Sequence, residues 1–140
     1  MALAERRRAA AELEIKLDPD LRAPAAARAF VRHHLPALGF PGLVDNGTLV
    51  AVELVTNAVK HAGVYGPIWL SLRLADGGHP LIEAQDCSPR LPEFREPDYE
   101  AESGRGLHVV QALCAAFDWN PVDGGKIVWA LLETAPTFSP

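Results

Sequence analysis

The chain has 140 residues, of which 22% are charged, and its formal net charge at pH 7 is -5. This length suits one compact domain with a hydrophobic core and is short for two. The mild acidity argues against direct nucleic-acid binding, because phosphate backbones are normally bound by clustered Lys and Arg in a basic domain. We therefore expect a single domain over residues 1–140.

The ends of the chain carry little structural signal. The basic run at residues 6–8 predicts a solvated, flexible N-terminal arm over residues 1–11, and residues 134–140 read as a tail. No apolar stretch approaches the roughly 20 residues that span a bilayer, and the first residues lack the apolar centre of a signal peptide. We expect a cytoplasmic protein without membrane contact, in which Cys114 is a buried free thiol.

The first predicted elements are a strand and a helix. Residues 12–17 alternate polar and apolar side chains, which predicts a half-buried strand, at an edge of the sheet. Residues 21–38 predict a helix, with Pro24 in its first turn and Pro36 near its end. Residues 39–42 form a loop.

The clearest element is a helix over residues 45–62. Asp45 is suited to be its N-cap, and Gly63 is suited to a left-handed stop. Its spacing divides the helix into two faces. The face expected to pack comprises Leu49, Val52, Val55, Val59 and Ala62, and the polar stripe beside it comprises Glu53, Asn57, Lys60 and His61.

A hairpin follows, with strands over residues 68–74 and 81–86 joined by a turn at 76–78. Proline and charge predict an irregular loop over 88–103, after which residues 104–117 predict a helix and 126–132 a strand. This order predicts an α+β fold. We expect a two-layer α/β sandwich, with a mixed, mostly antiparallel sheet and its helices on one face.

Glu53 and Asn57 lie one helical turn apart. An amide oxygen can join phosphate oxygens and waters around Mg²⁺, and a carboxylate nearby can orient or deprotonate an attacking hydroxyl. A solvated Glu/Asn face would give the same pair. Lys60 and His61 could reach phosphate, although a helix C-terminus favours positive residues without any ligand.

Two later segments complete a candidate nucleotide site. Gly104-Arg105-Gly106 at a helix start lets backbone N–H groups approach anionic oxygens, and an ordinary flexible connection into a helix would also explain it. Asp86 at a strand end could accept a hydrogen bond from an exocyclic amino group, which would select adenine over a base with a carbonyl there. It could equally begin a turn.

Together these segments resemble the GHKL superfamily of ATP-binding domains, which includes histidine-kinase ATPase domains, gyrase-type ATPases and anti-sigma-factor serine kinases. The resemblance covers about residues 43–132. Residues 53–62 look like the N box, 86–89 like a reduced first glycine box, and 104–110 like the second glycine box. The small size resembles most the stand-alone anti-sigma-factor serine/threonine kinases.

The resemblance implies a Bergerat-type fold and the cofactors ATP and Mg²⁺, with residues 87–103 as the ATP lid. It implies that Glu53 is the general base, that Asn57 holds Mg²⁺, and that Asp86 binds the adenine amino group. The phosphate-binding segment would comprise Gly104, Arg105, Gly106 and Leu107. Two departures stand out: Ser88 replaces the glycine of the usual Asp-x-Gly, and residues 126–128 lack the threonine that relatives often place near adenine.

The leading hypothesis is an anti-sigma-factor serine/threonine kinase that phosphorylates a small antagonist protein and restrains a sigma factor. Homodimerisation is common among the relatives. The alternative is a non-catalytic regulatory binding module of the same fold, either nucleotide-sensing or nucleotide-free. A detached histidine-kinase-like ATPase domain is a third hypothesis, disfavoured because no phosphoacceptor segment is recognisable.

Overall fold

The computed structural model describes residues 13–90 and 102–134, and for residues 102–107 it describes the backbone alone. The predicted arm over 1–11, the part of the predicted lid at 91–101 and the end of the tail at 135–140 lie outside these ranges. No helix in the described ranges is long and apolar enough to cross a membrane.

Five strands form one sheet in the order β1-β2-β3-β5-β4, and every neighbouring pair is antiparallel. The predicted edge strand and the predicted hairpin are both confirmed, with β2 and β3 joined through Gly77 and Gly78, whose φ values are positive. The strands are β1 (Leu13–Leu17), β2 (Ile68–Leu74), β3 (Pro80–Asp86), β4 (Cys114–Val122) and β5 (Gly125–Leu132).

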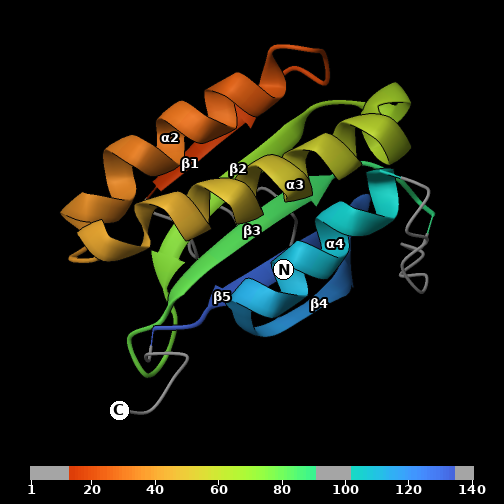
Figure 1. Cartoon of the computed structure of the whole chain (residues 1–140). Helices are drawn as coiled ribbons and strands as arrows, with labels where there is room; N and C mark the ends of the chain where they lie inside the picture. The colour runs from red at the N-terminus through yellow and green to blue at the C-terminus, as the bar shows by residue number, and fades with distance from the viewer. Residues whose placement is uncertain (1–12, 91–101, 135–140) are drawn as a thin grey trace.

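In the described part of the chain, three helices cover one face of this sheet (Figure 1), which confirms the predicted two-layer α+β sandwich. They are α2 (Ala23–Ala37), α3 (Val44–Ala62) and α4 (Glu102–Leu113), and short 3₁₀ turns lie at Pro41–Leu43 and Gly63–Tyr65. The core lies between the two layers. Its largest fully buried apolar side chains include Leu35, Val55, Ile68, Leu70, Leu72, Ile82, Val110 and Leu132.

Helix α3 buries a different face from the one predicted. Leu49 is 51% exposed and Val52 is only half-buried, so the prediction was wrong for these two residues, whereas Val59 is half-buried and packs against the core as expected. The face against the core is instead rich in small side chains, which let a helix lie close to a sheet. The buried residues of α3 are Gly47, Thr48, Val50, Ala51, Leu54, Val55, Ala58 and Ala62.

The helix ends at Ala62 as predicted and begins one residue earlier, but both predicted capping roles were wrong. The helix begins at Val44, so Asp45 lies in its first turn, where its carboxylate accepts a hydrogen bond from Nη1 of Arg32 at 3.2 Å. A carboxylate there suits the helix dipole without capping the helix. Gly63 has a φ of -61° and continues into the 3₁₀ turn, whereas the positive φ of 145° occurs at Gly66.

The predicted helix over 104–117 ends earlier than expected. Helix α4 stops at Leu113, and β4 begins at Cys114 and pairs along β5 with a bulge between Cys114 and Ala116. The small residues of this segment resemble a helix locally. Pairing with β5 satisfies their backbone groups, and tertiary structure overrides the weak local preference.

Cys114 is half-buried, and burial raises the pKa of its thiol to about 11. In a Cys87→Ser variant it is the only thiol, because the chain has two cysteines. We expect iodoacetamide at pH 8 to alkylate it roughly 100-fold more slowly than a free cysteine in a peptide, because only the thiolate reacts. The rate should rise with pH up to about 11. If mass spectrometry showed that Cys114 and the peptide cysteine are alkylated at equal rates at pH 8, the half-buried environment of the Cys114 thiol would be contradicted.

Candidate functional site

The elements that carry the predicted site residues meet at one end of the sheet. Helix α3 packs against both β3 and α4. Figure 1 shows the end of β3, the C-terminal half of α3 and the start of α4 at the same end of the molecule. The structure thus brings together the helix with Glu53 and Asn57, the strand that ends in Asp86, and the glycine segment of α4.

Asn57 has an unsatisfied polar group. Its side chain is half-buried, and its amide nitrogen Nδ2 is buried without a hydrogen-bond partner among the residues that the structure describes. A buried donor left unsatisfied costs about 1–3 kcal/mol, so such a group calls for a ligand. A phosphate oxygen would satisfy Nδ2 while the amide oxygen remained able to coordinate Mg²⁺. The residue present therefore fits the cofactor that the sequence predicted.

Glu53 is half-buried one turn before Asn57, and its side chain forms no hydrogen bond or ion pair with another residue that the structure describes. Its predicted role as a general base stays a prediction. Lys60 and His61 lie in the last turn of α3 and are both exposed. The positive charge of Lys60 suits the helix C-terminus, and the predicted contact of both residues with phosphate stays a prediction.

The glycine segment lies inside the beginning of α4. The helix begins at Glu102, two residues before the predicted start, so Gly104 and Arg105 fall in its first turn. Backbone N–H groups in a first turn have no partner within the helix and can bind anions. Gly106 is one position further, where the N–H can pair within the helix. The side chains of Arg105 and Leu107 lie outside the described part of the structure.

Asp86 begins a turn, which is one of the two roles that the sequence left open for it; its contact with a base stays a prediction. Its Oδ1 accepts a hydrogen bond from the backbone N–H of Ser88 at 2.9 Å, which forms a turn. Its carboxylate also pairs with Lys126, whose Nζ lies 2.9 Å from Oδ2 and 3.2 Å from Oδ1. Asp86 is 2% exposed, so the predicted base acceptor is a buried and already paired charge.

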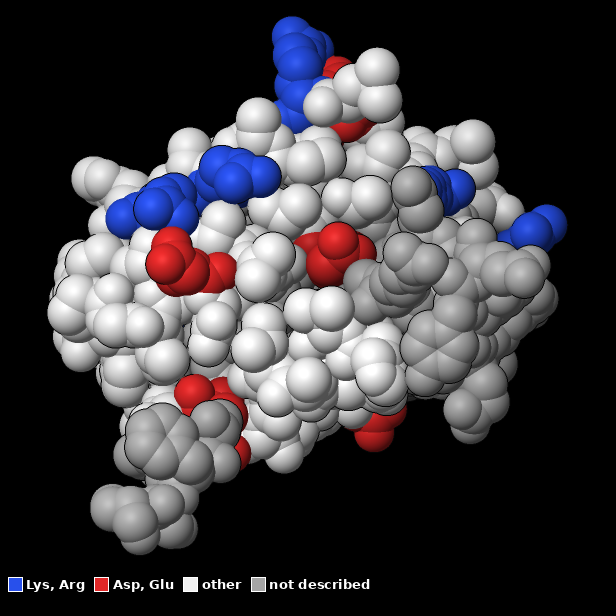
Figure 2. All heavy atoms as spheres, in the orientation of Figure 1, with Lys and Arg blue, Asp and Glu red and all other residues white. Residues whose placement is uncertain are grey.

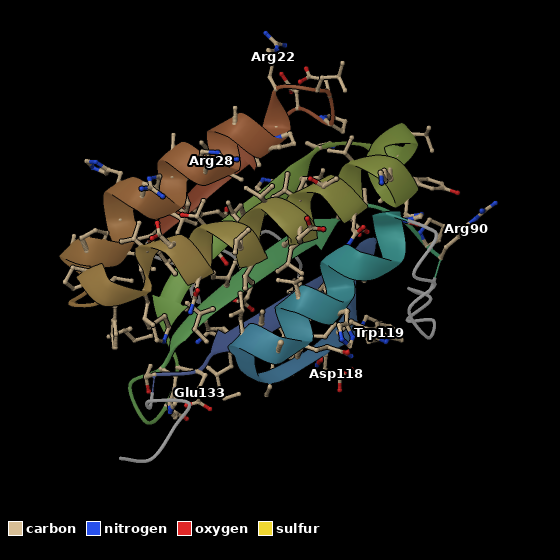
Figure 3. All side chains as sticks on the ribbon, in the orientation of Figure 1. Arg22, Arg28, Arg90, Asp118, Trp119 and Glu133 are labelled. Atoms are coloured by element: carbon tan, nitrogen blue, oxygen red, sulfur yellow. The ribbon has the colours of Figure 1, made fainter. Side chains whose placement is uncertain are left out.

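Ser88, which replaces the expected glycine, is also buried. Its Oγ accepts a hydrogen bond from the backbone N–H of Arg90 at 3.0 Å, so the hydroxyl stabilises the loop in which Ser88 lies. The Arg90 side chain is exposed and points away from the sheet in Figure 3. Ser88 therefore fixes the turn after Asp86, and Arg90 is not directed into the region between the helices.

Lys126 was not among the predicted site residues. The signal was a single charged residue in an otherwise apolar strand, since buried lysines are rare unless paired. Breaking a buried ion pair costs about 3–5 kcal/mol, whereas a hydrogen bond to a charged group contributes about 1.5–3 kcal/mol. Displacing Lys126 from Asp86 by a base amino group would therefore cost more free energy than the new hydrogen bond contributes.

Gly125 lets β5 start directly against the backbone of Asp86. A Cβ at Gly125 would overlap the carbonyl oxygen of Asp86 and lie 3.1 Å from the Cα of Cys87. We expect Gly125→Ala to lower the free energy of unfolding by about 2 kcal/mol or more, because backbone atoms must move apart. In urea denaturation, Gly42→Ala is the control, because its Cβ meets nothing within 4 Å. Equal midpoints for the two variants would contradict this packing.

The antiparallel sheet, the helix layer and the position of the glycine segment define an α+β domain of the histidine-kinase ATPase type. The family model described as histidine kinase-like ATPase domain matches residues 16–132. The chain therefore belongs to this family. No curated protein sequence matches it significantly.

Two solved structures share the fold. The crystal structure of the SiaB-SiaC complex from Pseudomonas aeruginosa aligns with a TM-score of 0.64 and 13% identity, covering 92% of this chain and 94% of the other. The histidine kinase domain of the Erythrobacter litoralis EL346 blue-light activated histidine kinase aligns with a TM-score of 0.51 and 17% identity. That alignment covers 76% of this chain and 64% of the kinase chain.

Proposed function

We propose that this protein binds Mg-ATP where α3, the end of β3 and the start of α4 meet. The observation that carries the proposal is the buried, unpartnered Nδ2 of Asn57 on the helix that also presents Glu53. The family match supports a nucleotide in this position. Mg²⁺ held by Asn57 would offset phosphate charge, and the backbone of Gly104 and its neighbours would face the phosphate oxygens.

We further propose that the protein transfers the γ-phosphoryl group to a Ser or Thr hydroxyl of a partner protein. Glu53 accepts the proton of that hydroxyl as its oxygen bonds to phosphorus and the bond to the ADP oxygen breaks. Its lack of a partner among the described residues leaves its carboxylate free for this role. The remaining residues position the reacting groups, which is the main protein contribution to phosphoryl transfer.

The proposed partners are a sigma factor and its small antagonist protein, in the cytoplasm, by resemblance to anti-sigma-factor kinases. One solved structure that shares the fold is a complex of two proteins, SiaB and SiaC, which supports a protein partner for this fold. Figure 2 shows Lys and Arg side chains near α2, with only a few separate charges among the described residues over α3. A weakly charged surface of this kind suits a protein more than a nucleic acid.

A second candidate function is a regulatory binding module that does not transfer phosphate. The observation that favours it is the buried Asp86–Lys126 pair, because the predicted adenine acceptor already has a cationic partner. A nucleotide-free module would bind its partner protein with the same affinity in the presence and absence of ATP, whereas a nucleotide-sensing module would change that affinity without transferring phosphate.

Labelled ATP separates the two functions. The purified protein is incubated with γ-labelled ATP, Mg²⁺ and candidate antagonist proteins from the same cells. The kinase proposal predicts label on a Ser or Thr of one antagonist and release of ADP in equal amount. An antagonist that binds tightly without becoming labelled would overturn the kinase proposal and favour the binding module.

A further inference from the structure

The outward face of α3 carries an exposed leucine beside the proposed general base. Leu49 is 51% exposed, and Glu53 follows it by one helical turn, so the two residues lie about 6 Å apart along the helix. Val52 and Thr56, which lie beside them on the outward face, are half-buried and uncharged. A specific protein interface buries about 800 Å² on each partner. A protein whose hydroxyl reaches Glu53 from solvent therefore also covers Leu49.

A cation on α2 lies next to this leucine. Helices α2 and α3 pack side by side and run antiparallel (Figure 1), and Arg32 of α2 pairs with Asp45 of α3 at 3.2 Å. One turn further from the connection between the helices, the facing positions are Arg28 and Leu49. Arg28 is exposed on the face of the molecule that Figure 3 shows, and it forms no hydrogen bond or ion pair with another described residue. Its charge is therefore available to a partner.

We propose that the protein whose Ser or Thr is phosphorylated docks on Arg28 and Leu49. It places an apolar side chain over Leu49 and a carboxylate on Arg28, while its hydroxyl lies at Glu53. This inference rests on the proposed kinase function, and it identifies the docking surface for the protein substrate of that kinase.

The arrangement of charge favours this occupant. Helix α2 contains Arg28 and Arg32 and no acidic residue, and Arg32 already pairs with Asp45, so Arg28 is the cation left for a carboxylate. The proposed nucleotide lies toward α4, on the other side of Glu53, and leaves the α2 side uncovered. An apolar contact flanked by a charged one is typical of protein interfaces, which have an apolar centre and a polar rim.

The test is the steady-state rate of transfer from labelled ATP to the antagonist protein that the wild type labels. For Leu49→Asp and for Arg28→Glu we expect the KM for the antagonist to rise by about tenfold or more, because each adds an unpaired carboxylate to the interface. The kcat and the calorimetric affinity for Mg-ATP should stay within about threefold of the wild type. A raised KM at unchanged kcat indicates lost docking and not lost chemistry.

Leu21→Asp and Arg22→Glu are the matched controls, because they make the same changes of charge outside the docking surface. Leu21 is 96% exposed and lies in the loop of Pro19, and a Cβ at Gly63 would lie 3.2 Å from the Cβ of Pro19. This loop is therefore next to the C-terminal end of α3, roughly 20 Å along the helix from Leu49. The Arg22 side chain points away from the body of the molecule in Figure 3. Both controls should keep the wild-type KM.

Thermal melts of the two docking variants should match the wild type, because both replaced side chains are exposed. A KM within about threefold of the wild type in either docking variant would overturn the inference while leaving the proposed kinase function intact. An equal rise of the KM in the controls would overturn it too, because the effect would then come from charge alone. If the wild-type protein labels no antagonist, both the kinase function and the docking surface are overturned.

Discussion

Asn57→Ala is expected to weaken binding of ATP in Mg²⁺ by about 100-fold or more, because it removes the proposed metal ligand and the amide donor together. The fold should be retained, since the side chain is only half-buried and its Nδ2 makes no hydrogen bond in the described structure. Removing an unsatisfied buried donor also removes the free-energy cost of burying it. The melting temperature of the variant without nucleotide should therefore be equal to or above that of the wild type.

Asn46→Ala is the matched control for this experiment. Asn46 is an exposed asparagine near the start of the same helix. Its replacement should leave the affinity for Mg-ATP unchanged. If Asn57→Ala binds Mg-ATP as tightly as Asn46→Ala does, then Asn57 does not hold the cation.

Glu53→Gln is expected to lower the rate of phosphoryl transfer by about 10²–10⁴-fold while leaving the affinity for Mg-ATP within about threefold of the wild type. Glutamine keeps the size of the side chain and loses the ability to accept the proton. The measurement is single-turnover transfer from labelled ATP to the antagonist protein.

Asp45→Ala controls for the loss of a carboxylate from the same helix. Asp45 is exposed, and its pair with Arg32 should contribute no more than about 1 kcal/mol to stability. Transfer at the wild-type rate is expected in this control. Wild-type transfer in Glu53→Gln would show that another group accepts the proton, or that none is needed.

Local patterns predicted much of this fold. Period-two alternation gave β1 and the β2–β3 hairpin, and the glycines at 77 and 78 adopt the positive φ values that such a turn requires. The long apolar spacing gave α3 within one residue of its observed bounds. These features depend on residues close together in the sequence, so the sequence alone is informative.

Features that depend on packing were predicted poorly. The start of strand β4, up to residue 117, was read as the end of a helix, and the rest of the strand was not predicted. Its strand conformation comes from pairing with β5 and not from the small residues at Cys114 and Ala116. The buried face of α3 was misplaced for a similar reason. Small residues such as Ala51 and Ala58 allow the helix to lie against the sheet, and apolar size alone favoured the larger Leu49 and Val52.

In the candidate site, too, local features were predicted from the sequence and features that depend on packing were not. Spacing along one helix singled out Glu53 and Asn57, and the position after a strand singled out Asp86; their assigned roles stay predictions. The pairing of Asp86 with Lys126 joins residues 40 positions apart and depends on the register between β3 and β5. The sequence contained the clue of a charged residue in an apolar strand, but not its partner.

The most direct test of nucleotide binding is calorimetric titration of the wild-type protein with ATP, with and without Mg²⁺. We predict saturable binding to one site per chain that is at least about tenfold tighter with Mg²⁺, as expected if Asn57 holds the cation. No binding at millimolar ATP under either condition would contradict the proposed function and favour a regulatory module that acts through protein contacts alone.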